Sequence, residues 1–481
     1  MIQGRLFING QWQASGASEF LDVFNPCTQE VIGQVPAADA ADVDKAVAAA
    51  KAAFLGWKKA GGAVRARFLK AIAARLRERI EELATLSSRD NGKPLAEARV
   101  DMADAAASFD YYADQAIALE ARQNSAVPVP DTAYQTQLRL EPAGIAALIV
   151  PWNFPLVTTS WKVAPTLAAG CTVVLKPSEI TPLVELELGN ILMDVGLPPG
   201  VVNIITGYGA VGAAMTSHRD VAKISFTGSN AVGVRVMQAA AQGFKSVSLE
   251  LGGKSPIIVF ADGDEKQAVD LIIGGIFTNA GQMCSATSRL LIEKQIANRL
   301  LEKVVAAARA LKLGDALDPT TTMGPITTKA QFEKVQNYIA MGKSLGHRLA
   351  TGGGKPASLN QGWFLEPTIF TNVPTTSPLW REEIFGPVLC VQTFENEAEA
   401  IAHANDSDFG LVATIVTHDW QKAQRVANAL EAGHVWINSP QTIFMETSWG
   451  GFKASGIGRE LGPWGLSAYL EVKHKTTPLS A

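Results

Sequence analysis

One cysteine lies in a segment that suits a reactive thiol. Cys284 stands in Phe277-Thr-Asn-Ala-Gly-Gln-Met-Cys284-Ser, a polar stretch with a glycine, whereas Cys171 and Cys390 fit buried structural thiols better. A cysteine with thiolate character attacks electrophilic carbon and holds the product as a covalent intermediate. The segment by itself leaves a nucleophile and a structural thiol equally open.

Two other polar residues follow apolar strand candidates. Glu250 lies in Leu249-Glu-Leu-Gly-Gly-Lys254, and an acid at the end of an apolar strand is costly unless it is paired or used. Asn153 follows the stretch Ile145–Val150, and its side-chain amide can donate a hydrogen bond to an oxyanion. Ligands of open α/β sheets bind outside the carboxyl ends of the strands. Cys284, Glu250 and Asn153 are therefore expected at one such rim.

A lysine and a glutamate follow a third strand candidate. The stretch Thr172–Leu175 runs into Lys176-Pro-Ser-Glu179, whose charged side chains can reach the hydroxyl groups of a ribose. A carboxylate there also repels a 2′-phosphate, which favours NAD over NADP. A second segment, Phe226-Thr-Gly-Ser-Asn-Ala-Val-Gly233, follows a strand and opens a helix, so its backbone N–H groups can meet a pyrophosphate.

The segment Gly207-Tyr-Gly-Ala-Val-Gly212 also matches the dinucleotide fingerprint G-x-G-x-x-G. That fingerprint expects an acidic residue about 20 positions further on to hold the ribose. No Asp or Glu occurs between Val221 and Leu249. A plain strand-to-helix turn is therefore the favoured interpretation of this loop, with a standard Rossmann loop as the alternative.

The elements around these residues alternate between strand and helix patterns. Helical patterns such as Pro182–Val195 and Ala231–Gln242 separate the apolar strand candidates, which predicts a parallel sheet with helices on both faces. A second alternating series follows Gly252, so two α/β halves are expected. The strand candidates of the first half are Ile145–Val150, Thr172–Leu175, Val202–Ile205, Lys223–Phe226 and Val247–Leu251.

The residues before these strands are mainly helical by their pattern. Helices are predicted over Ala41–Lys59, Val64–Asp90 and Pro94–Gln123, the second on a continuous apolar stripe. Alternating polar and apolar residues over Gln123–Glu141 then indicate a β-ribbon that leaves its domain to meet another subunit. The tail Leu466–Thr477 is predicted to be a strand.

Composition excludes several classes of protein. Of the 481 residues, 47% are hydrophobic and 18% charged, which is typical of a compact globular chain. The net charge of −4 leaves no broad basic surface for nucleic acid or a membrane. The apolar stretches fall short of the ~20 residues of a membrane span, and the start shows no signal core. The cysteines are widely separated, so we expect a cytoplasmic enzyme with neither disulfides nor a metal site.

Seven motifs occur in order along the chain: PWNFP, KPSE, FTGSxxxG, LELGGK, GQxCS, EEIFGPV and GRELG. With them the chain resembles the NAD(P)-dependent aldehyde dehydrogenase superfamily over nearly its whole length. The resemblance implies an α/β fold with two open parallel-sheet domains, a Rossmann-like cofactor domain and a catalytic domain, and a small β-ribbon for oligomerisation. These parts are expected over 1–122 and 143–251, over 252–454, and over 123–142 and 455–481.

The resemblance also implies a role for each matched residue. Cys284 is expected to be the nucleophile, Glu250 the general base and Asn153 the oxyanion donor, with Lys162 and Glu460 in a polar network behind them. An aldehyde would become a carboxylic acid through a cysteine thiohemiacetal and a thioester, with NAD as the hydride acceptor. The residues expected to hold NAD are Trp152, Lys176, Ser178, Glu179, Gly209, Phe226, Gly228, Ser229, Leu251, Glu383 and Phe385.

Within the superfamily, longer segments such as Gly458-Arg-Glu-Leu-Gly-Pro-Trp464 resemble the betaine aldehyde and aminoaldehyde dehydrogenases. That group holds a cationic head in an aromatic box, which is half kept here. Thr278 stands where a tryptophan is common, and His434 stands where a small residue accompanies a bulky trimethylammonium group, so betaine aldehyde is disfavoured. The residues expected to contact substrate are Asp101, Asp104, Phe154, Trp161, Thr278, Met283, Ser285, Phe444 and Trp449.

Two classes of substrate stay open. Asp101 and Asp104 share a face of a predicted helix and match the acidic pair that receives amino groups, which favours an ω-aminoaldehyde slightly. A medium-chain or aromatic aldehyde in an apolar tunnel is the alternative, and the two acids are then solvated surface charges. A non-catalytic structural or binding protein on the same fold is disfavoured because position 284 is a cysteine. The ribbon's edge strands predict a homodimer or homotetramer.

Overall fold

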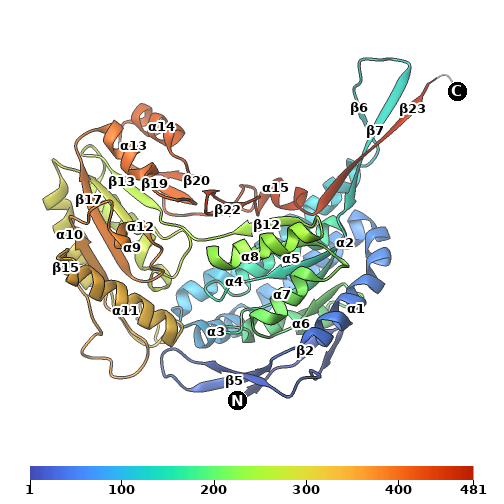
Figure 1. The fold of residues 1–481 in the computed structure, drawn as a ribbon, viewed down its shortest axis with the longest axis horizontal. Helices are drawn as coiled ribbons and strands as arrows, with labels where there is room; N and C mark the ends of the chain where they lie inside the picture. Colours follow the sequence, from blue (N-terminus) through green and yellow to red (C-terminus); the bar gives the residue numbers. More distant parts are fainter. Residues whose placement is uncertain (480–481) are drawn as a thin grey trace.

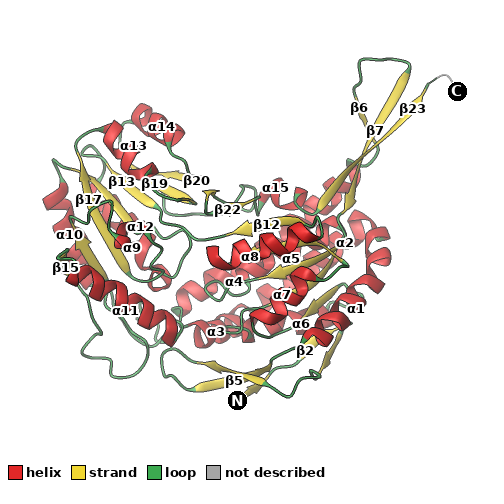
Figure 2. Cartoon of the chain, in the orientation of Figure 1, coloured by secondary structure: helices red, strands yellow, loops and turns green. Residues whose placement is uncertain are grey.

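The computed structural model describes residues 1–479 as two α/β halves with a projecting three-stranded ribbon (Figures 1 and 2). Each half is built on one sheet whose central strands run parallel and whose helices cover both faces. The expected α/β class with two parallel sheets is confirmed. Within residues 1–479 no helix combines the length and apolar character that crossing a membrane requires.

The first sheet has eight strands, and the five in its centre are parallel. Strands β8 and β9 are buried along their whole length, so their apolar runs belong to the core rather than to one wetted face. In spatial order the strands are β22 (Gly456–Ile457), β12 (Ser246–Glu250), β11 (Val221–Thr227), β8 (Ile145–Ile149), β9 (Thr172–Lys176), β10 (Val202–Ile204), β2 (Leu6–Ile8) and β3 (Gln11–Gln13).

Eight helices belong to this half of the described chain. Helices α2, α4 and α5 pack together on one side of the sheet around a core of alanine, leucine and aromatic side chains. The helices are α1 (Ala40–Lys59), α2 (Gly61–Glu78), α3 (Ile80–Asn91), α4 (Leu95–Ala121), α5 (Val157–Ala169), α6 (Leu183–Asp194), α7 (Gly209–Ser217) and α8 (Asn230–Gln242).

The single helix expected over Val64–Asp90 is wrong, because the chain breaks at Arg79. Arg79 leaves helical geometry with φ −108° and ψ 15°, and α3 starts directly after it. Its guanidinium bonds Glu82 and also Glu187 on α6, at 2.6 Å in the second case. The bond to α6 directs α3 against that helix, while the apolar stripe continues through the break and hides it from periodicity.

The second sheet has seven strands, all parallel except β15 at its edge. Its strands in spatial order are β15 (Arg348–Thr351), β16 (Thr368–Thr371), β17 (Val388–Phe394), β14 (Arg289–Glu293), β13 (Pro256–Val259), β19 (Val412–Val416) and β20 (His434–Ile437). Its helices are α9 (Glu265–Phe277), α10 (Ala297–Arg309), α11 (Lys329–Ser344), α12 (Pro378–Arg381), α13 (Glu397–Asn405) and α14 (Trp420–Ala429), with a 3₁₀ turn η1 (Thr278–Gly281) after α9.

Smaller elements complete the described chain. A three-stranded sheet at the N-terminus joins β1 (Ile2–Gln3), β5 (Val31–Pro36) and β4 (Phe20–Phe24). Strand β18 (Phe409–Gly410) pairs with β21 (Phe452–Lys453), and helix α15 (Gly462–Ser467) leads toward the C-terminal strand.

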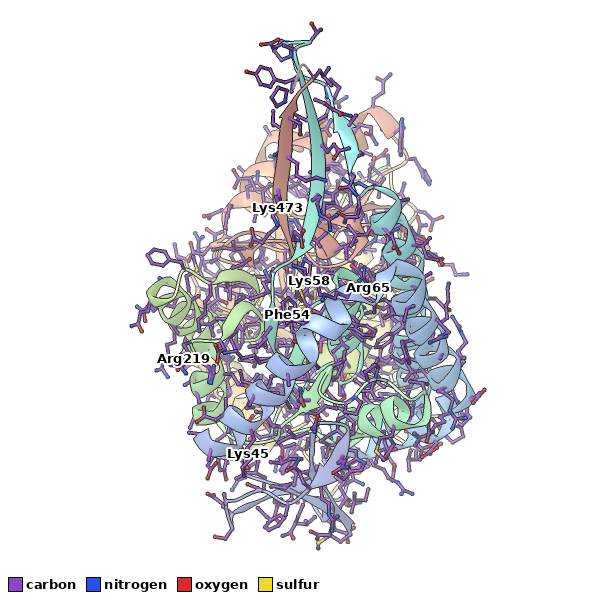
Figure 3. All side chains as sticks on the ribbon, turned by 90° about the vertical axis from the view of Figure 1, so that its right-hand side faces the viewer. Lys45, Phe54, Lys58, Arg65, Arg219 and Lys473 are labelled. Atoms are coloured by element: carbon purple, nitrogen blue, oxygen red, sulfur yellow. The ribbon has the colours of Figure 1, made fainter. Side chains whose placement is uncertain are left out.

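The expected ribbon is formed by β6 (Ser125–Val127), β7 (Tyr134–Pro142) and β23 (Leu470–Pro478), which project from the body (Figure 1). Strand β23 pairs with β7 antiparallel from Leu470 opposite Pro142 to Pro478 opposite Tyr134. At its base the Glu141 carboxylate accepts from Lys58 at 2.7 Å and approaches Lys473 at 3.5 Å (Figure 3). Most of β23 is exposed, so its outer edge is free to pair.

Candidate active site

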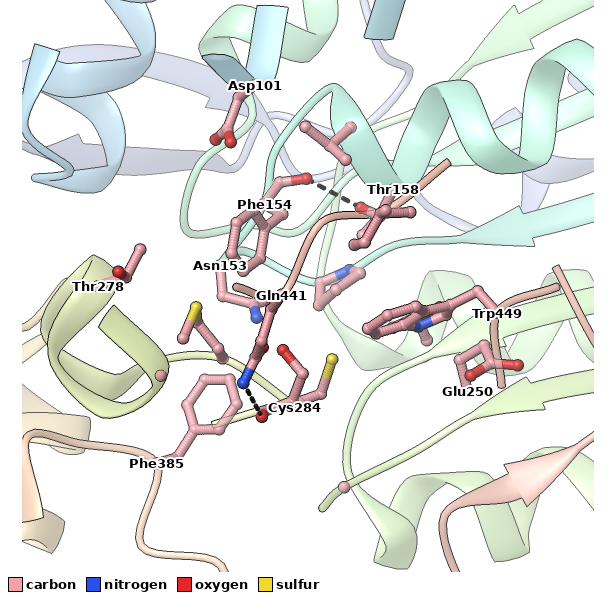
Figure 4. Close-up of a pocket in the computed structure, with 18 of the residues that line it drawn as sticks. Asp101, Asn153, Phe154, Thr158, Glu250, Thr278, Cys284, Phe385, Gln441 and Trp449 are labelled. Atoms are coloured by element: carbon pink, nitrogen blue, oxygen red, sulfur yellow. Dashed lines mark hydrogen bonds between the residues drawn. The ribbon is translucent and has the colours of Figure 1, made fainter. Parts of the chain in front are cut away.

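A cavity of about 730 Å³ lies at the carboxyl ends of the first sheet, where the second half faces it (Figure 4). The segments that follow β8, β11 and β12 all contribute to its wall, as the strand-end argument predicts. The second half contributes the turn after α9 and the segment around Glu383. Asn153, Glu250 and Cys284 therefore line one cavity although they are far apart in the sequence.

The backbone before Cys284 adopts a conformation that residues other than glycine rarely take. Asn279 and Ala280 have φ angles of 49° and 52°, and Gly281 follows at 73°. A Cβ atom at Gly281 would lie 2.2 Å from the Gly386 carbonyl oxygen, so only glycine fits. Strain of this kind persists where the surroundings fix a functional side chain, and here it directs the Cys284 thiol.

Asn153 joins this turn to the segment after β8. Its Nδ2 donates to the Gln282 carbonyl oxygen at 3.0 Å, and the Asn279 side chain donates to the Asn153 carbonyl oxygen at 2.9 Å. An asparagine amide carries two N–H donors, so one is left for a ligand. Asn153 is buried, and a buried donor held in place is suited to stabilise a negative charge that develops on a substrate oxygen.

Burial sets the protonation state of the Cys284 thiol. Removal from water, followed by the carboxyl groups of Glu383 and Glu250 as weaker causes, raises the pKa of Cys284 to about 12. The free thiol is therefore protonated at neutral pH. Attack on a carbonyl carbon consequently requires a group in the site that takes the proton from sulfur.

Glu250 has the properties of such a proton acceptor. It lines the cavity, it is 3% exposed, and neither of its carboxyl oxygens has a hydrogen-bond partner within residues 1–479. Burial raises the pKa of Glu250 well above its usual value, repulsion from Glu460 adds to the rise, and Lys162 opposes it. A buried acid without a partner is costly, which points to a use in the reaction.

The network behind Glu250 connects it to an aromatic wall. Lys162 on α5 is fully buried and forms an ion pair with Glu460, whose carboxylate also accepts from Ser225 Oγ at 3.2 Å. The backbones of Glu460 and Trp449 exchange two hydrogen bonds of 2.7 Å. The predicted pair of Lys162 and Glu460 thus lies where it fixes both the charge near Glu250 and the position of Trp449.

The part of the cavity at the start of α8 suits the pyrophosphate and nicotinamide end of NAD. Ser229 is the N-cap residue of α8 and no side chain caps the helix, so backbone N–H groups of its first turn are open. A Cβ atom at Gly228 would lie 2.6 Å from the Phe226 ring, which keeps the backbone bare there. The rings of Trp152 and Phe385 stand edge to face at 5.4 Å on the same wall.

Two more of the expected NAD residues line this wall, whereas five do not line the cavity. Glu383 accepts from the Gly253 N–H at 2.8 Å, and Leu251 follows β12. Lys176 ends β9 and donates to the Glu179 carboxylate at 3.1 Å at the same edge of the first sheet. The five that do not line the cavity are Lys176, Ser178, Glu179, Gly209 and Phe226.

Aromatic side chains form the wall next to Glu250. The rings of Trp161 and Trp449 stand edge to face with centroids 5.7 Å apart, and Phe154 lies on the same cavity (Figure 4). Trp436 lies behind them, 6.4 Å from Trp449, and stacks on His434 at 4.3 Å. The half-kept aromatic box of the sequence is thus a continuous surface, with His434 outside the cavity.

The two acids expected to receive an amino group have different surroundings. Asp101 is buried and forms an ion pair with Lys93, whose Nζ also lies 3.7 Å from the centre of the Phe154 ring. Asp104 accepts from Trp161 Nε1 at 2.7 Å. Burial raises the pKa of Asp104 to about 7. The hydrogen bond from Trp161 opposes this rise in pKa, and the charge of Asp101 adds to it. Asp101 is therefore already neutralised by the protein, and Asp104 is not.

Thr278, Met283 and Ser285 line the cavity as expected, whereas Phe444 does not. Phe444 is 58% exposed, because the loop turns it outward after Ile443. The resemblance that placed Phe444 in the substrate site holds no information on which way a loop residue points. This geometry does not support a place for Phe444 in the substrate site.

The wall also contains polar residues that were not expected from the sequence, among them Glu97, Asp270 and Gln441. Glu97 precedes Asp101 by one turn and Asp104 by two, so helical spacing could have found it. Burial raises the pKa of Glu97 to about 7, although it accepts from the Asn279 N–H at 2.9 Å. Gln441 donates to the Ser285 carbonyl oxygen at 3.2 Å, a contact without a local sequence signal.

The chain belongs to the aldehyde dehydrogenase family, whose family model matches residues 12–475. It is accordingly an NAD-dependent enzyme that oxidises aldehydes, and the expected fold and cofactor are confirmed. It is 49% identical to aminoaldehyde dehydrogenase 2, peroxisomal, of Pisum sativum over 99% of this chain and 96% of that protein. It is also 49% identical to a chloroplastic aminoaldehyde dehydrogenase of Arabidopsis thaliana over 98% of this chain and 95% of that protein.

A solved structure agrees closely with this fold. Betaine aldehyde dehydrogenase from Staphylococcus aureus in complex with NAD⁺ matches with a TM-score of 0.97 and 40% identity, over 100% of this chain and 96% of that one. The expected cytoplasmic location is wrong by the names of the relatives, since the pea protein is called peroxisomal and the Arabidopsis protein chloroplastic. The lack of a signal core at the start of the sequence is therefore a poor guide to location.

Proposed function

We propose that Cys284 is the nucleophile, Asn153 the oxyanion donor and Glu250 the proton acceptor of this enzyme. The raised pKa of Cys284 and the unpartnered carboxyl oxygens of Glu250 support this division of work. The thiol gives up its proton toward Glu250 as sulfur bonds to the aldehyde carbon. The oxygen of the resulting thiohemiacetal then takes a hydrogen bond from the Asn153 amide, a contact of a kind worth ~3 kcal/mol of barrier.

The second half of the reaction uses the same carboxyl group. When bound, NAD supplies the acceptor for the hydride that leaves the substrate carbon, and we place it against Trp152, Ser229 and Glu383. The product on Cys284 is a thioester. After Glu250 has released the thiol proton to solvent, it takes a proton from a water molecule whose oxygen attacks the thioester carbon. Glu250 then returns this proton to the leaving sulfur, which releases a carboxylic acid and restores the thiol.

We propose that the aldehyde carries a terminal ammonium group, bound at Asp104. The observation that carries this proposal is the Asp104 carboxylate, which lines the cavity beside the aromatic wall and is oriented by Trp161 Nε1. The relatives in pea and Arabidopsis are named aminoaldehyde dehydrogenases. Lys93 forms an ion pair with Asp101, so Asp104 is the carboxylate that anchors the substrate ammonium group. Asp101 instead holds Lys93 against α4.

A medium-chain or aromatic aldehyde is the second candidate. One observation favours it: the wall formed by Phe154, Trp161 and Trp449 is apolar and continuous. Such a surface takes an alkyl chain or a ring without any charge. The two candidates differ in one property, because only an ω-aminoaldehyde loses binding when the Asp104 charge is removed.

We further propose that β7 and β23 mediate a homodimer or homotetramer. We also propose a cofactor domain formed by residues 1–122 and 143–251, and a catalytic domain formed by residues 252–454. The exposed edge of β23 supports the first point, and the two separate sheets support the second. A monomer by light scattering at micromolar concentration would contradict the assembly.

The assignment of the nucleophile is tested by Cys284→Ala. We expect this variant to bind NAD, as followed by quenching of tryptophan fluorescence, and to form no NADH from any aldehyde. Cys390→Ala is the matched control, because Cys390 is a buried cysteine that does not line the cavity. NADH formation by Cys284→Ala would disprove the assignment.

A further inference from the structure

Glu97, in the first turn of α4, forms a hydrogen bond with the second half of the molecule. Helix α4 begins after Pro94, and no side-chain hydrogen bond caps it. The Glu97 Oε2 atom accepts from the backbone N–H of Asn279 at 2.9 Å. The two residues are 182 positions apart in the sequence, and Glu97 lines the same cavity as Cys284. This bond therefore joins the two halves beside the nucleophile.

The N–H group that Glu97 binds belongs to the left-handed turn before Cys284. Asn279 opens this turn with φ 49°, and Ala280 and Gly281 follow at 52° and 73°. For residues other than glycine such a backbone is unfavourable, so contacts from the surroundings must hold it. The bond from Asn279 to Glu97 is one of these contacts, and it acts on the first residue of the turn.

Asn279 also connects the turn to the oxyanion donor. Its Nδ2 donates to the Asn153 carbonyl oxygen at 2.9 Å, and its carbonyl oxygen accepts from the Gln282 N–H at 3.0 Å. Gln282 lies two residues before Cys284, and its carbonyl oxygen accepts from Asn153 Nδ2 at 3.0 Å. Figure 4 shows Asn153 and Cys284 on the cavity that these bonds surround. A shift of Asn279 therefore displaces the thiol and the amide together.

The contacts on either side of Asn279 do not replace Glu97. The buried Gln282 side chain closes the far end of the turn, where its Nε2 donates to the Asn279 carbonyl oxygen at 2.9 Å. At the near end, Thr278 directs its hydroxyl back to the Gly274 carbonyl oxygen at 2.8 Å and so bonds to α9. Glu97 is thus the side chain that reaches the first N–H of the turn from another helix.

The surroundings of Glu97 show that it acts through this bond. Burial raises the pKa of Glu97 to about 7, Lys93 and the bond from the turn oppose the rise, and Asp101 adds to it. The pKa of the Cys284 thiol is raised by burial and by two other carboxyl groups of the site. The backbone bond, rather than its charge, is therefore the main link between Glu97 and the thiol.

We propose that Glu97 is a positioning residue for the nucleophile, because its carboxyl group fixes the Asn279 N–H and thereby the turn that presents Cys284. This inference rests on the proposed function, since it takes Cys284 as the nucleophile and Asn153 as the oxyanion donor. The bond joins protein atoms alone, so its effect is independent of any amino group on the substrate. A misplacement of about 1 Å at reacting atoms can cost about 10²-fold in rate.

Two variants separate the reach of the side chain from its charge. Glu97→Gln keeps an oxygen at the same distance and loses the charge, whereas Glu97→Asp keeps the charge and is one methylene group too short. With butanal we expect Glu97→Asp to lower the first-turnover rate of NADH formation, seen by stopped flow, by about 10- to 100-fold. The loss should be equal with 3-aminopropanal, and KM should change less than about twofold for both aldehydes.

The controls are the conservative variant and a distant acid. Glu97→Gln should stay within about threefold of the original rate, because its amide oxygen still accepts from Asn279. Asp114→Asn, which changes an exposed acid on the same helix, should leave the rate unchanged. A general loss of stability would lower the melting temperature of the variants without a rate loss confined to Glu97→Asp.

The outcomes separate this inference from the proposed function. Equal rates for Glu97→Asp and the original enzyme overturn the role of Glu97, and so does a loss in Glu97→Gln as large as that in Glu97→Asp. A loss confined to 3-aminopropanal also overturns it, because Glu97 then binds the amino group. In each case the proposed function stands if Cys284→Ala forms no NADH. NADH formation by Cys284→Ala overturns the proposed function and this inference with it.

Discussion

Replacement of Asp104 by asparagine tests how the enzyme selects an amino group. The amide keeps an oxygen that accepts from Trp161 Nε1, so the aromatic wall stays in position while the charge is lost. A hydrogen bond to a charged group contributes about 1.5–3 kcal/mol. The kcat/KM for 3-aminopropanal should therefore fall about 10- to 150-fold, since 1.4 kcal/mol corresponds to a factor of ten. Butanal, which has a methyl group in place of the ammonium group, should be oxidised as before.

The same anchor predicts a pH dependence. Since burial raises the pKa of Asp104 to about 7, the carboxylate is mostly protonated below that pH and ionised above it. The ratio of kcat/KM for 3-aminopropanal over butanal should thus rise as the pH increases through about 7, and the Asp104→Asn ratio should stay flat. Rates are followed by NADH absorbance. Asp114→Asn, an exposed acid on the same helix, is the matched control. Equal losses for both aldehydes in Asp104→Asn would refute the anchor.

Three further predictions concern the wall and the core. Glu250→Gln should lower both the first turnover of NADH and the steady rate by about 10²- to 10⁴-fold, seen by stopped flow, because neither the Cys284 thiol nor the hydrolytic water then has its proton acceptor; an unchanged steady rate would remove Glu250 from that role. Burial raises the pKa of Glu185 to about 8, so its contribution to stability is present at low pH and is lost as the pH rises through about 8. Glu185→Gln should flatten this fall of stability with pH in thermal scans, at about 1.4 kcal/mol per pKa unit. An identical dependence of stability on pH in the variant and the original enzyme would contradict the role of Glu185. Thr278→Trp should fill the open space in front of Gly274, where a Cβ atom would meet nothing within 4 Å, and lower kcat/KM more for 4-aminobutanal that carries an N-butyl group than for 3-aminopropanal, whereas equal losses would place position 278 elsewhere.

The sequence predicted the parts of the site that depend on where strands end. Asn153 follows β8 and Glu250 ends β12, and the parallel strands of one sheet bring their carboxyl ends to one edge whatever the intervening helices do. The ribbon was also predictable, because alternation over Gln123–Glu141 and over the tail is local. The strand ends and the ribbon could both be predicted because each strand shows its pattern of apolar residues within its own segment.

The remaining features depend on contacts between distant side chains. The pair of Lys93 and Asp101 removes one of two acids that look equivalent in the sequence, and no pattern at Lys93 announces it. The bond from Arg79 to Glu187 ends α2 within an unbroken apolar stripe. Asp270 lies on the cavity because α9 packs against Thr287, which no spacing on α9 alone could indicate.

The most direct test of the account is the rate of NADH formation by the purified enzyme with NAD and a panel of aldehydes: 3-aminopropanal, butanal, betaine aldehyde, octanal and benzaldehyde. An ammonium anchor at Asp104 predicts that 3-aminopropanal exceeds butanal about tenfold or more in kcat/KM, which corresponds to about 1.4 kcal/mol of transition-state discrimination. A higher kcat/KM for octanal than for 3-aminopropanal would contradict it and make the aromatic wall an apolar tunnel for alkyl chains.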